Sequence, residues 1–361
     1  MRDDLPYTTP LGAYDAEAEA LLAALKAGDD DARWRFKWAH PRYRGEKVEA
    51  VDPGALDLSD ARLVVAHGYA FESWADLAAF AADEGPKPFE AAADAIVAGK
   101  LATLRTMLQA DPALARARST RRHRATLLHY IAANGVEGYR QKTPPNAVEI
   151  ARVLLESGAE VDALADMYEQ KCTTMSMLVS SSPPHAAGLQ FALAEALLDH
   201  GAAYRGPGTE WQSAVLTALA FGFLDTAQAF VRRGAPVESL AAAAGLGRVG
   251  DAARLLPQAG EEERHVALAL AAQHGHAEIV TLLLEAGEDP DRYNPPKFHA
   301  HSTPLHQAVW ADHEGVVRLL IARGARLDLR DTIFDGTPLG WALHGKKDEM
   351  AEILRRAGAQ E

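Results

Sequence analysis

Cysteine is almost absent from this chain of 361 residues, which contains Cys172 alone. A single cysteine can form no internal disulfide, and it excludes a zinc site built from several cysteines. The first residues, MRDDLPYTTP, lack the apolar stretch behind a basic start that marks a secretory signal. No apolar run approaches the roughly 18 residues needed to cross a bilayer. These absences predict a protein of a reducing cytoplasm with no membrane partner.

An excess of basic residues is also missing. The formal net charge is −13 at pH 7, which is the wrong sign for a general attraction to nucleic acid or to anionic membranes. One segment, Arg33–Arg44, interleaves arginines with aromatic rings, as some nucleic-acid platforms do. Its Trp34 and Trp38 are spaced i, i+4, however, so a buried helical stripe flanked by solvated arginines explains the segment more simply. We therefore expect no nucleic-acid partner.

Sequence signatures of catalysis are lacking as well. The chain has no GxSxG nucleophile motif, no glycine-rich phosphate loop followed by Lys-Ser or Lys-Thr, and no GxGxxG. Its composition is that of a folded protein, with 48% hydrophobic and 24% charged residues, so a large core is expected. The remaining source of information is internal repetition.

A motif recurs with a period of 34 residues near the C-terminus. Thr303–Ala308 reads TPLHQA, and Thr337–Ala342 reads TPLGWA. In each copy the threonine can cap the start of a helix, and the proline takes the first helical position, where its missing N–H leaves no bond unmade. The leucines of the helix that follows recur at i, i+3 and i+4, a stripe that only a neighbouring repeat can bury.

Related copies lie upstream, each with an apolar helical pattern that closes at a glycine. The closing glycines are Gly158, Gly201, Gly234, Gly260, Gly287, Gly324 and Gly358. Together with TLLHYIAANG at Thr126–Gly135 and QHGHAEIVTLLLEAG at Gln273–Gly287, these motifs resemble the ankyrin repeat family, whose unit has about 33 residues. The resemblance implies an all-α solenoid of antiparallel helix pairs with short β-hairpin fingers between them. It also implies a concave groove lined by the fingers and the first helices.

The repeats divide the chain into two expected domains. About eight units are expected from Phe89 onward, in an array over residues 87–361 whose units are irregular at about 173–260. Residues 1–86 lack the repeat and are expected to form a small helical region that caps the stack. Its expected helices are Asp15–Ala27, Ala32–His40, Leu58–Gly68 and Ser73–Ala82. Part of this region, Ser59–Phe80, resembles a segment found ahead of the repeats in some bacterial ankyrin proteins.

The most suggestive site for chemistry is the long finger ahead of TPLHQA. On an extended segment His299 and His301 would face the same side, an arrangement that suits a divalent metal or an anion. Asp331 and Asp335, on the next finger, would add carboxylates. The other interpretation is structural, because in this family the histidine of TPLH, here His306, is usually hydrogen-bonded within and between repeats. The sequence has no further metal-ligand spacing to decide between the two.

Aromatic residues gather in the same two fingers and the helices behind them. Tyr293, Phe298, Trp310 and Phe334 are the candidates for contacts with a partner, because aromatic rings bury much area for little loss of entropy. Trp341 fits the groove and the core equally well.

A second candidate site lies at the other end of the array. Arg121, Arg122 and Arg124 fall where the first finger is expected, and they would dock a phosphate, a carboxylate or an acidic peptide. Two insertions, Gly138–Asn146 and Ser180–Gly188, are expected to be surface loops without function.

Two hypotheses about function follow. The first is a binding or scaffold protein that holds a protein or peptide partner in its groove, through the aromatic residues, histidines, aspartates and arginines named above. The alternative is an enzyme or small-molecule binder, in which His299 and His301 bind a metal or act as acid and base, with Asp331 and Asp335 beside them.

Overall fold

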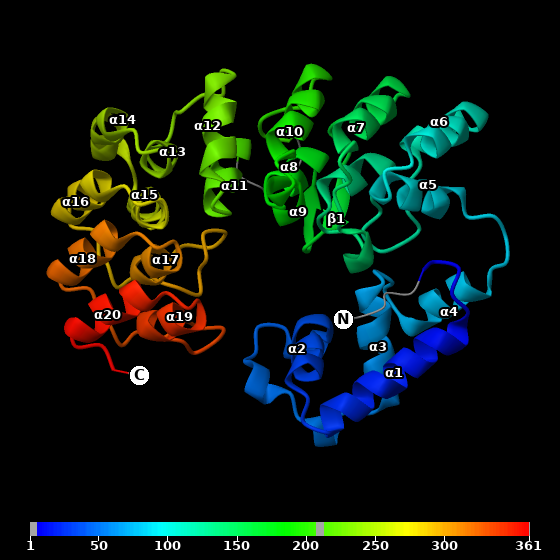
Figure 1. The fold of residues 1–361 in the computed structure, drawn as a ribbon, viewed down its shortest axis with the longest axis horizontal. Coiled ribbons are helices and arrows are strands. Elements are labelled where there is room, and N and C mark those ends of the chain that lie inside the picture. Colours follow the sequence, from blue (N-terminus) through cyan, green and yellow to red (C-terminus); the bar gives the residue numbers. More distant parts are fainter. Residues whose placement is uncertain (1–5, 207–212, 361) are drawn as a thin grey trace. The chain divides into compact units, whose positions relative to one another are not determined.

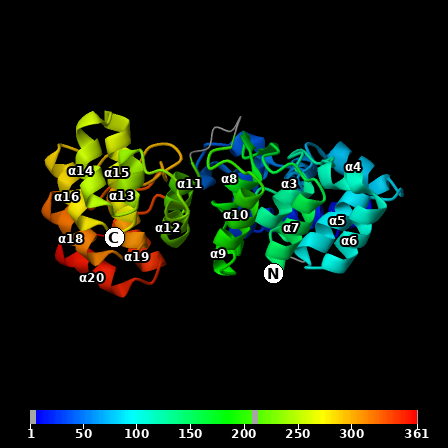
Figure 2. The same ribbon diagram turned by 90° about the horizontal axis from the view of Figure 1, so that it is seen from above.

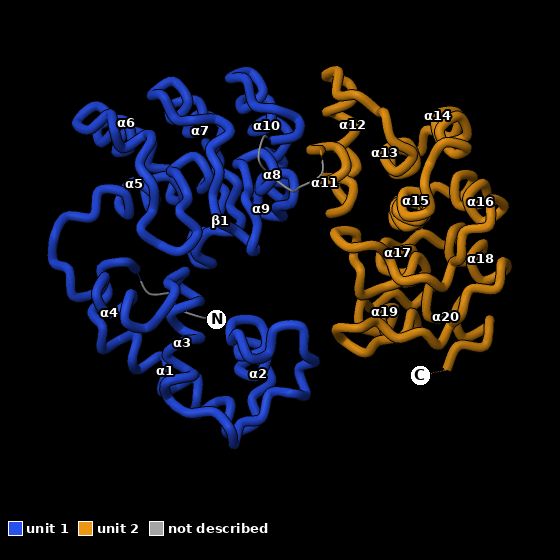
Figure 3. The backbone as a smooth tube through the Cα atoms, turned by 180° about the vertical axis from the view of Figure 1, so that it is seen from behind, with its two compact units in different colours: residues 1–211 blue, residues 212–361 orange. Residues whose placement is uncertain are grey.

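The computed structural model describes residues 6–206 and 213–360, and nearly all of its regular structure is helical (Figure 1; turned by 90° in Figure 2). The described residues contain one two-stranded sheet, formed by β1 (Ala165–Met167) and β2 (Gln170–Cys172). Within the same residues we find no helix with the length and apolar character required to cross a membrane. The chain divides into two compact units, residues 1–211 and 212–361 (Figure 3).

Unit 1 begins with four helices that correspond to the four expected from the sequence. They are α1 (Leu11–Lys26), α2 (Asp30–Ala39), α3 (Leu58–Gly68) and α4 (Trp74–Ala82). The Asp29 carboxylate starts α2 by accepting the Ala32 N–H at 2.7 Å, and Asp57 starts α3 in a capping box. Their apolar faces meet in one core that includes Tyr14, Phe36 and Leu77.

The tryptophans of α2 do not form the buried stripe expected of them. Ala32 and Phe36, also spaced i, i+4, take the core face of the helix, with exposed fractions of 3% and 0%. Trp38 lies outside that face and is 61% exposed, with its ring stacked on Trp34 at 5.9 Å. Periodicity showed that one face of α2 is aromatic, but packing against α1 and α3 decided which face is buried.

Three helix pairs follow within unit 1. They are α5 (Pro88–Val97) with α6 (Leu101–Ala110), the 3-10 helix η5 (Leu127–Ala132) with α7 (Ala147–Glu156), and α8 (Thr174–Leu178) with α10 (Gln190–Asp199). The second members, α6, α7 and α10, lie side by side in both ribbon views. A short helix, α9 (Ser182–Ala186), occupies the insertion that was expected to be a surface loop.

Shorter elements connect these helices. The 3-10 helices are η1 (Pro41–Tyr43), η2 (Val48–Ala50), η3 (Pro53–Ala55), η4 (Pro112–Arg116), η6 (Gly138–Arg140) and, in unit 2, η7 (Leu256–Gln258). In the first finger Arg118 and Thr126 form an isolated β-bridge. The first finger also bonds to the turn between α3 and α4, where the Arg122 N–H donates to the Ala70 carbonyl at 2.9 Å. The domain boundary expected at residues 86 and 87 stays a prediction.

Unit 2 contains five helix pairs. They are α11 (Ala214–Ala220) with α12 (Leu224–Arg232), α13 (Leu240–Gly245) with α14 (Val249–Leu255), α15 (Glu261–Gln273) with α16 (Ala277–Glu285), α17 (Pro304–Trp310) with α18 (Glu314–Ala322), and α19 (Pro338–His344) with α20 (Asp348–Arg356). With the three pairs of unit 1, the described residues hold eight pairs, which confirms the expected solenoid of helix pairs.

The pair α13/α14 is compressed. Helix α13 has 6 residues, whereas its neighbour α15 has 13. Its alanines and Gly245 allow a close approach, since a Cβ placed on Gly245 would lie 2.8 Å from a methyl group of Leu219 in α11. As a result the end of α15 reaches the end of α11, and the His274 Nε2–H donates to the Leu219 carbonyl at 2.8 Å.

Candidate binding surfaces

The long finger ahead of α17 is tightly turned rather than extended. Lys297 and His299 have positive φ values of 72° and 60°, and the Ser302 N–H donates to the His299 carbonyl at 3.0 Å. The His299 and His301 rings lie 6.0 Å apart, with their planes at an angle of 82°. Pro295 contributes to the turn by accepting the Phe298 N–H. Because of this turn, Phe298 is buried and unavailable to a partner.

His299 is held by the scaffold. Its Nε2–H donates to the Ala220 carbonyl at 2.7 Å, and burial lowers the pKa of its ring below the ordinary value for histidine. Within residues 6–206 and 213–360, no three or more His, Cys, Asp or Glu side chains are grouped to hold a metal ion. The geometry of His299 and His301 therefore gives no support to a shared metal or to an acid–base pair.

Asp331 is a structural residue and not the exposed carboxylate expected. It is 1% exposed, and its oxygens accept N–H groups from Ile333, Phe334 and Gly336 at 3.0, 2.6 and 2.9 Å. It also accepts the indole N–H of Trp341 at 2.9 Å. Burial alone would raise the pKa of Asp331, but these hydrogen bonds hold it below its ordinary value. Asp331 shapes the finger and orients Trp341.

Replacing Asp331 with alanine is expected to lower the thermal midpoint of unit 2 noticeably. The change leaves four N–H donors without their acceptor, and each loss costs about 0.5–1.5 kcal/mol where water replaces the carboxylate. Asp335→Asn is the matched control, because Asp335 is exposed, it pairs with the exposed Arg330 at 3.3 Å, and asparagine tolerates its positive φ of 57°. Circular dichroism melting would measure both variants, and equal midpoints would contradict this role for Asp331.

Four of the rings ahead of and within α17 and α19 form one continuous surface. Trp310 lies 5.9 Å from Trp341, Trp341 lies 5.8 Å from His301, and His301 lies 6.3 Å from Phe334. We call these four side chains the aromatic surface. Trp310 is 49% exposed and Phe334 is 57% exposed, whereas Trp341 is half-buried against the core. Trp341 therefore serves both surface and core, which the sequence left open.

Tyr293 joins the two fingers beside the aromatic surface. Its ring is 36% exposed, and its hydroxyl donates to the Arg330 carbonyl at 2.6 Å. Of the expected contact residues, the structure thus brings His301, Trp310 and Phe334 together, with Tyr293 on the same pair of fingers.

A pocket opens beside Trp310. Its volume is about 430 Å³, and we call it the Trp310 pocket. It is lined by Phe221, Gln273, His274, His299, Gln307, Trp310 and His313. Of these residues, only His299 and Trp310 were expected from the sequence to contact a partner. The others were missed because the pocket depends on the contact of α11 with α15 across the compressed pair α13/α14, which no local pattern reveals.

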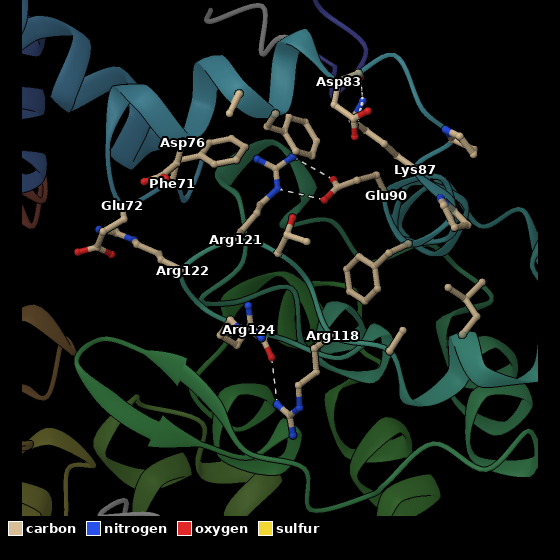
Figure 4. Close-up of a pocket in the computed structure, with 18 of the residues that line it drawn as sticks. Phe71, Glu72, Asp76, Asp83, Lys87, Glu90, Arg118, Arg121, Arg122 and Arg124 are labelled. Atoms are coloured by element: carbon tan, nitrogen blue, oxygen red, sulfur yellow. Dashed lines mark hydrogen bonds and ion pairs between the residues drawn. The ribbon is translucent and has the colours of Figure 1, made fainter.

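The arginines of the first finger lie in a cleft of about 790 Å³ between α4 and the first repeats of unit 1 (Figure 4). Arg122 and Arg124 are exposed on this cleft, and their docking of an anionic group stays a prediction. Arg121 differs from them. It is 2% exposed, its Nη1 donates to the Tyr69 carbonyl at 2.6 Å, and its guanidinium points toward Glu90. The expectation that Arg121 contacts a partner is therefore wrong, because its group is used inside the fold.

Arg121 belongs to a buried ion network. Its Nε lies 2.6 Å from Glu137 and its Nη2 lies 2.9 Å from Glu90. Arg140 also pairs with Glu90, at 2.5 Å, and with Asp94 at 2.7 Å. Arg140 is fully buried, although it lies in the insertion expected to be a surface loop without function. The network connects α5, the first finger and this insertion.

Glu137 stays charged at the centre of this network. Burial alone would raise its pKa, but a hydrogen bond with His123 and the charges of Arg121 and Arg140 lower it to about 2. The positive charges of both arginines are thereby balanced by buried carboxylates, so neither offers a charge to a ligand.

Comparisons with known proteins agree with this architecture. The model of the family described as ankyrin repeats in three copies matches residues 239–331 and 268–360. The ankyrin repeat and KH domain-containing protein mask-1 of Caenorhabditis elegans is 32% identical over 109 residues, which cover 28% of this chain and 4% of that protein. The inactive serine/threonine-protein kinase TEX14 of Mus musculus is 32% identical over 93 residues, or 25% of this chain and 6% of its own length. The chain thus spans a small part of either relative's length, and its residues 239–360 match the ankyrin repeat family.

Proposed function

We propose that this chain binds a protein partner through the aromatic surface of unit 2. The observation that supports this proposal is the exposure of Trp310 and Phe334, at 49% and 57%, on a surface whose other members are held in place. Large aromatic side chains are enriched among the residues that dominate binding energy, and exposed apolar patches mark interaction sites.

The scaffold beneath this surface supports such a role. Trp341 is oriented by Asp331, and its ring contacts His306 at 5.0 Å, so the exposed rings rest on a rigid base. A rigid base means that little conformational entropy is lost when a partner docks. We further propose that the protein acts in the cytoplasm of a bacterium, where the single buried Cys172 would remain reduced.

The double variant Trp310→Ala, Phe334→Ala is expected to lose its partner. Truncating two exposed anchors of an interface weakens binding by about tenfold or more for each, at 1–2 kcal/mol or above. The measurement is affinity capture from the source cells, followed by quantification of each retained protein. Trp38→Ala is the matched control, since this tryptophan is more exposed, at 61%, but lies on α2 in unit 1.

A specific partner would be retained by the wild type and by Trp38→Ala and lost from the double variant. Retention of the same proteins by all three chains would refute binding through the aromatic surface. A photoreactive phenylalanine at position 334 supplies direct evidence, with the same probe at the exposed Tyr168 of unit 1 as its control. The crosslinked protein from position 334 should be the one that the double variant loses.

A further inference from the structure

The Trp310 pocket presents hydrogen-bond acceptors to which no donor of the described residues bonds. Two of its histidines donate Nε2–H to backbone carbonyls: His274 to Leu219 at 2.8 Å and His299 to Ala220 at 2.7 Å. A carbonyl can only accept, so the proton of each neutral ring sits on Nε2 and its Nδ1 carries a lone pair. No donor among the described residues bonds to either Nδ1.

The two glutamines of the pocket likewise donate to the scaffold and keep an acceptor open. The amide nitrogen of Gln273 donates to the Ala220 carbonyl at 3.1 Å, and that of Gln307 donates to the Ser302 hydroxyl at 2.8 Å. This arrangement leaves the amide oxygen of each glutamine without a donor in the described part of the chain. The Gln307 side chain is also 4% exposed, so its oxygen has little access to bulk water except through the pocket.

The charge around the pocket is suited to a cation. Neither lysine nor arginine lines it. Burial lowers the pKa of His274 to about 4 and lowers that of His299 as well, so both rings are neutral at pH 7. Residues 213–360 contain 19 Asp and Glu against 15 Lys and Arg, which makes this part of the chain negative. An anion would find no positively charged donor among the lining residues, whereas a cation with several N–H groups would find acceptors.

The indole ring of Trp310 favours a planar guanidinium over an ammonium group. Its ring is 49% exposed and forms one wall of the pocket. A guanidinium group is planar, stacks on an indole face and carries five N–H donors in fixed directions, whereas an ammonium is a compact, strongly hydrated charge. We propose that the Trp310 pocket binds an arginine side chain of the partner segment that docks on the aromatic surface. This inference rests on the proposed function and names the chemistry of its ligand.

The test uses random peptides displayed on phage and selected on the full chain. Selected peptides are expected to contain an arginine. Its replacement by citrulline, which keeps the shape and removes the charge, should weaken binding by about tenfold, as expected for a lost cation–π contact and its hydrogen bonds. Lysine in the same place should also weaken binding, because it cannot stack on the indole in the same way.

The protein side of the test uses Trp310→Ala and Trp310→Phe. Alanine should weaken the arginine peptides roughly tenfold, phenylalanine should restore part of the affinity, and Trp38→Ala should leave it unchanged. Equal affinity of the arginine, citrulline and lysine peptides would overturn the inference. If those peptides still require Trp310 and Phe334, the proposed function stands without it. If no selected peptide requires either ring, the proposed function itself fails.

Discussion

Replacing Glu137 with alanine is expected to lower the free energy of unfolding of unit 1 by about 3–5 kcal/mol. Glu137 is 1% exposed and lies 2.6 Å from the Nε of Arg121. Its removal leaves the charges of Arg121 and Arg140 in the interior with only Glu90 and the half-exposed Asp94 to balance them. Breaking one partner of a buried ion network costs more than a surface ion pair contributes, because the remaining charge is not rehydrated.

Thermal and urea denaturation of the full chain would measure this effect. Glu156→Ala is the matched control, because Glu156 is exposed on α7 in the same unit and its loss should change stability by about 0.5 kcal/mol or less. Similar destabilisation by the two variants would show that the network contributes no more than surface charges.

The pH dependence of unfolding provides a second measurement of the Glu137 contribution. The pKa of Glu137 falls from 4.5 to about 2 on folding, so its stabilisation is complete above pH 4.5 and is lost as the pH falls toward 2.

Acidification from pH 7.5 to pH 5 is expected to destabilise both units, by about 2 kcal/mol for each fully buried histidine of the repeat motif. His129 and His306 are 0% exposed, and burial lowers the pKa of each to about 4 from 6.5. In both rings Nδ1 lies within hydrogen-bond distance of the preceding threonine hydroxyl and Nε2–H donates to a carbonyl, of Cys172 or Gly336. This geometry suits the neutral ring.

Because folding lowers the pKa of both histidines, the free energy of unfolding falls with falling pH. Between pH 6.5 and pH 4 the unfolded chain binds protons that the folded rings do not, so stability is full above pH 6.5 and declines as the pH falls. His306→Gln should remove the contribution of His306, about 2 kcal/mol between pH 7.5 and pH 5, and leave that of His274. His344→Ala, at an exposed position of α19, should retain both contributions. A stability that is constant between pH 7.5 and pH 5 would contradict the assignment.

The sequence by itself determined the helices and their pairing. Leu58–Gly68 was expected as a helix and is α3, with identical bounds, because Asp57 caps its start and its apolar residues have helical spacing. Thr303 and Thr337 similarly mark α17 and α19. The count of about eight pairs also follows largely from local signals, since seven of the eight pairs are followed by a closing glycine.

Only the tertiary structure decided which side chains are available to a partner. Arg121 and Arg122 are neighbours in one basic segment, yet the first is buried in the ion network and the second is exposed. Asp331 and Asp335 share a finger, yet only Asp331 is enclosed by four donors. Local periodicity predicts which face of an element is apolar. The partners of Arg121, however, lie 31 and 52 residues away, and those of Asp331 depend on the turn of its own finger.

The Trp310 pocket likewise combines features expected from the sequence with contacts that only the tertiary structure shows. The sequence indicated that His299 and Trp310 lie near the groove, but His299 donates to Ala220, 79 residues away, across the compressed pair α13/α14. That contact fixes the tautomer of the ring and closes the pocket beside it. The repeats are encoded locally because each helix pair follows from its own residues. The chemistry of their surface is decided by long-range packing, which turns some polar groups inward and leaves others without partners.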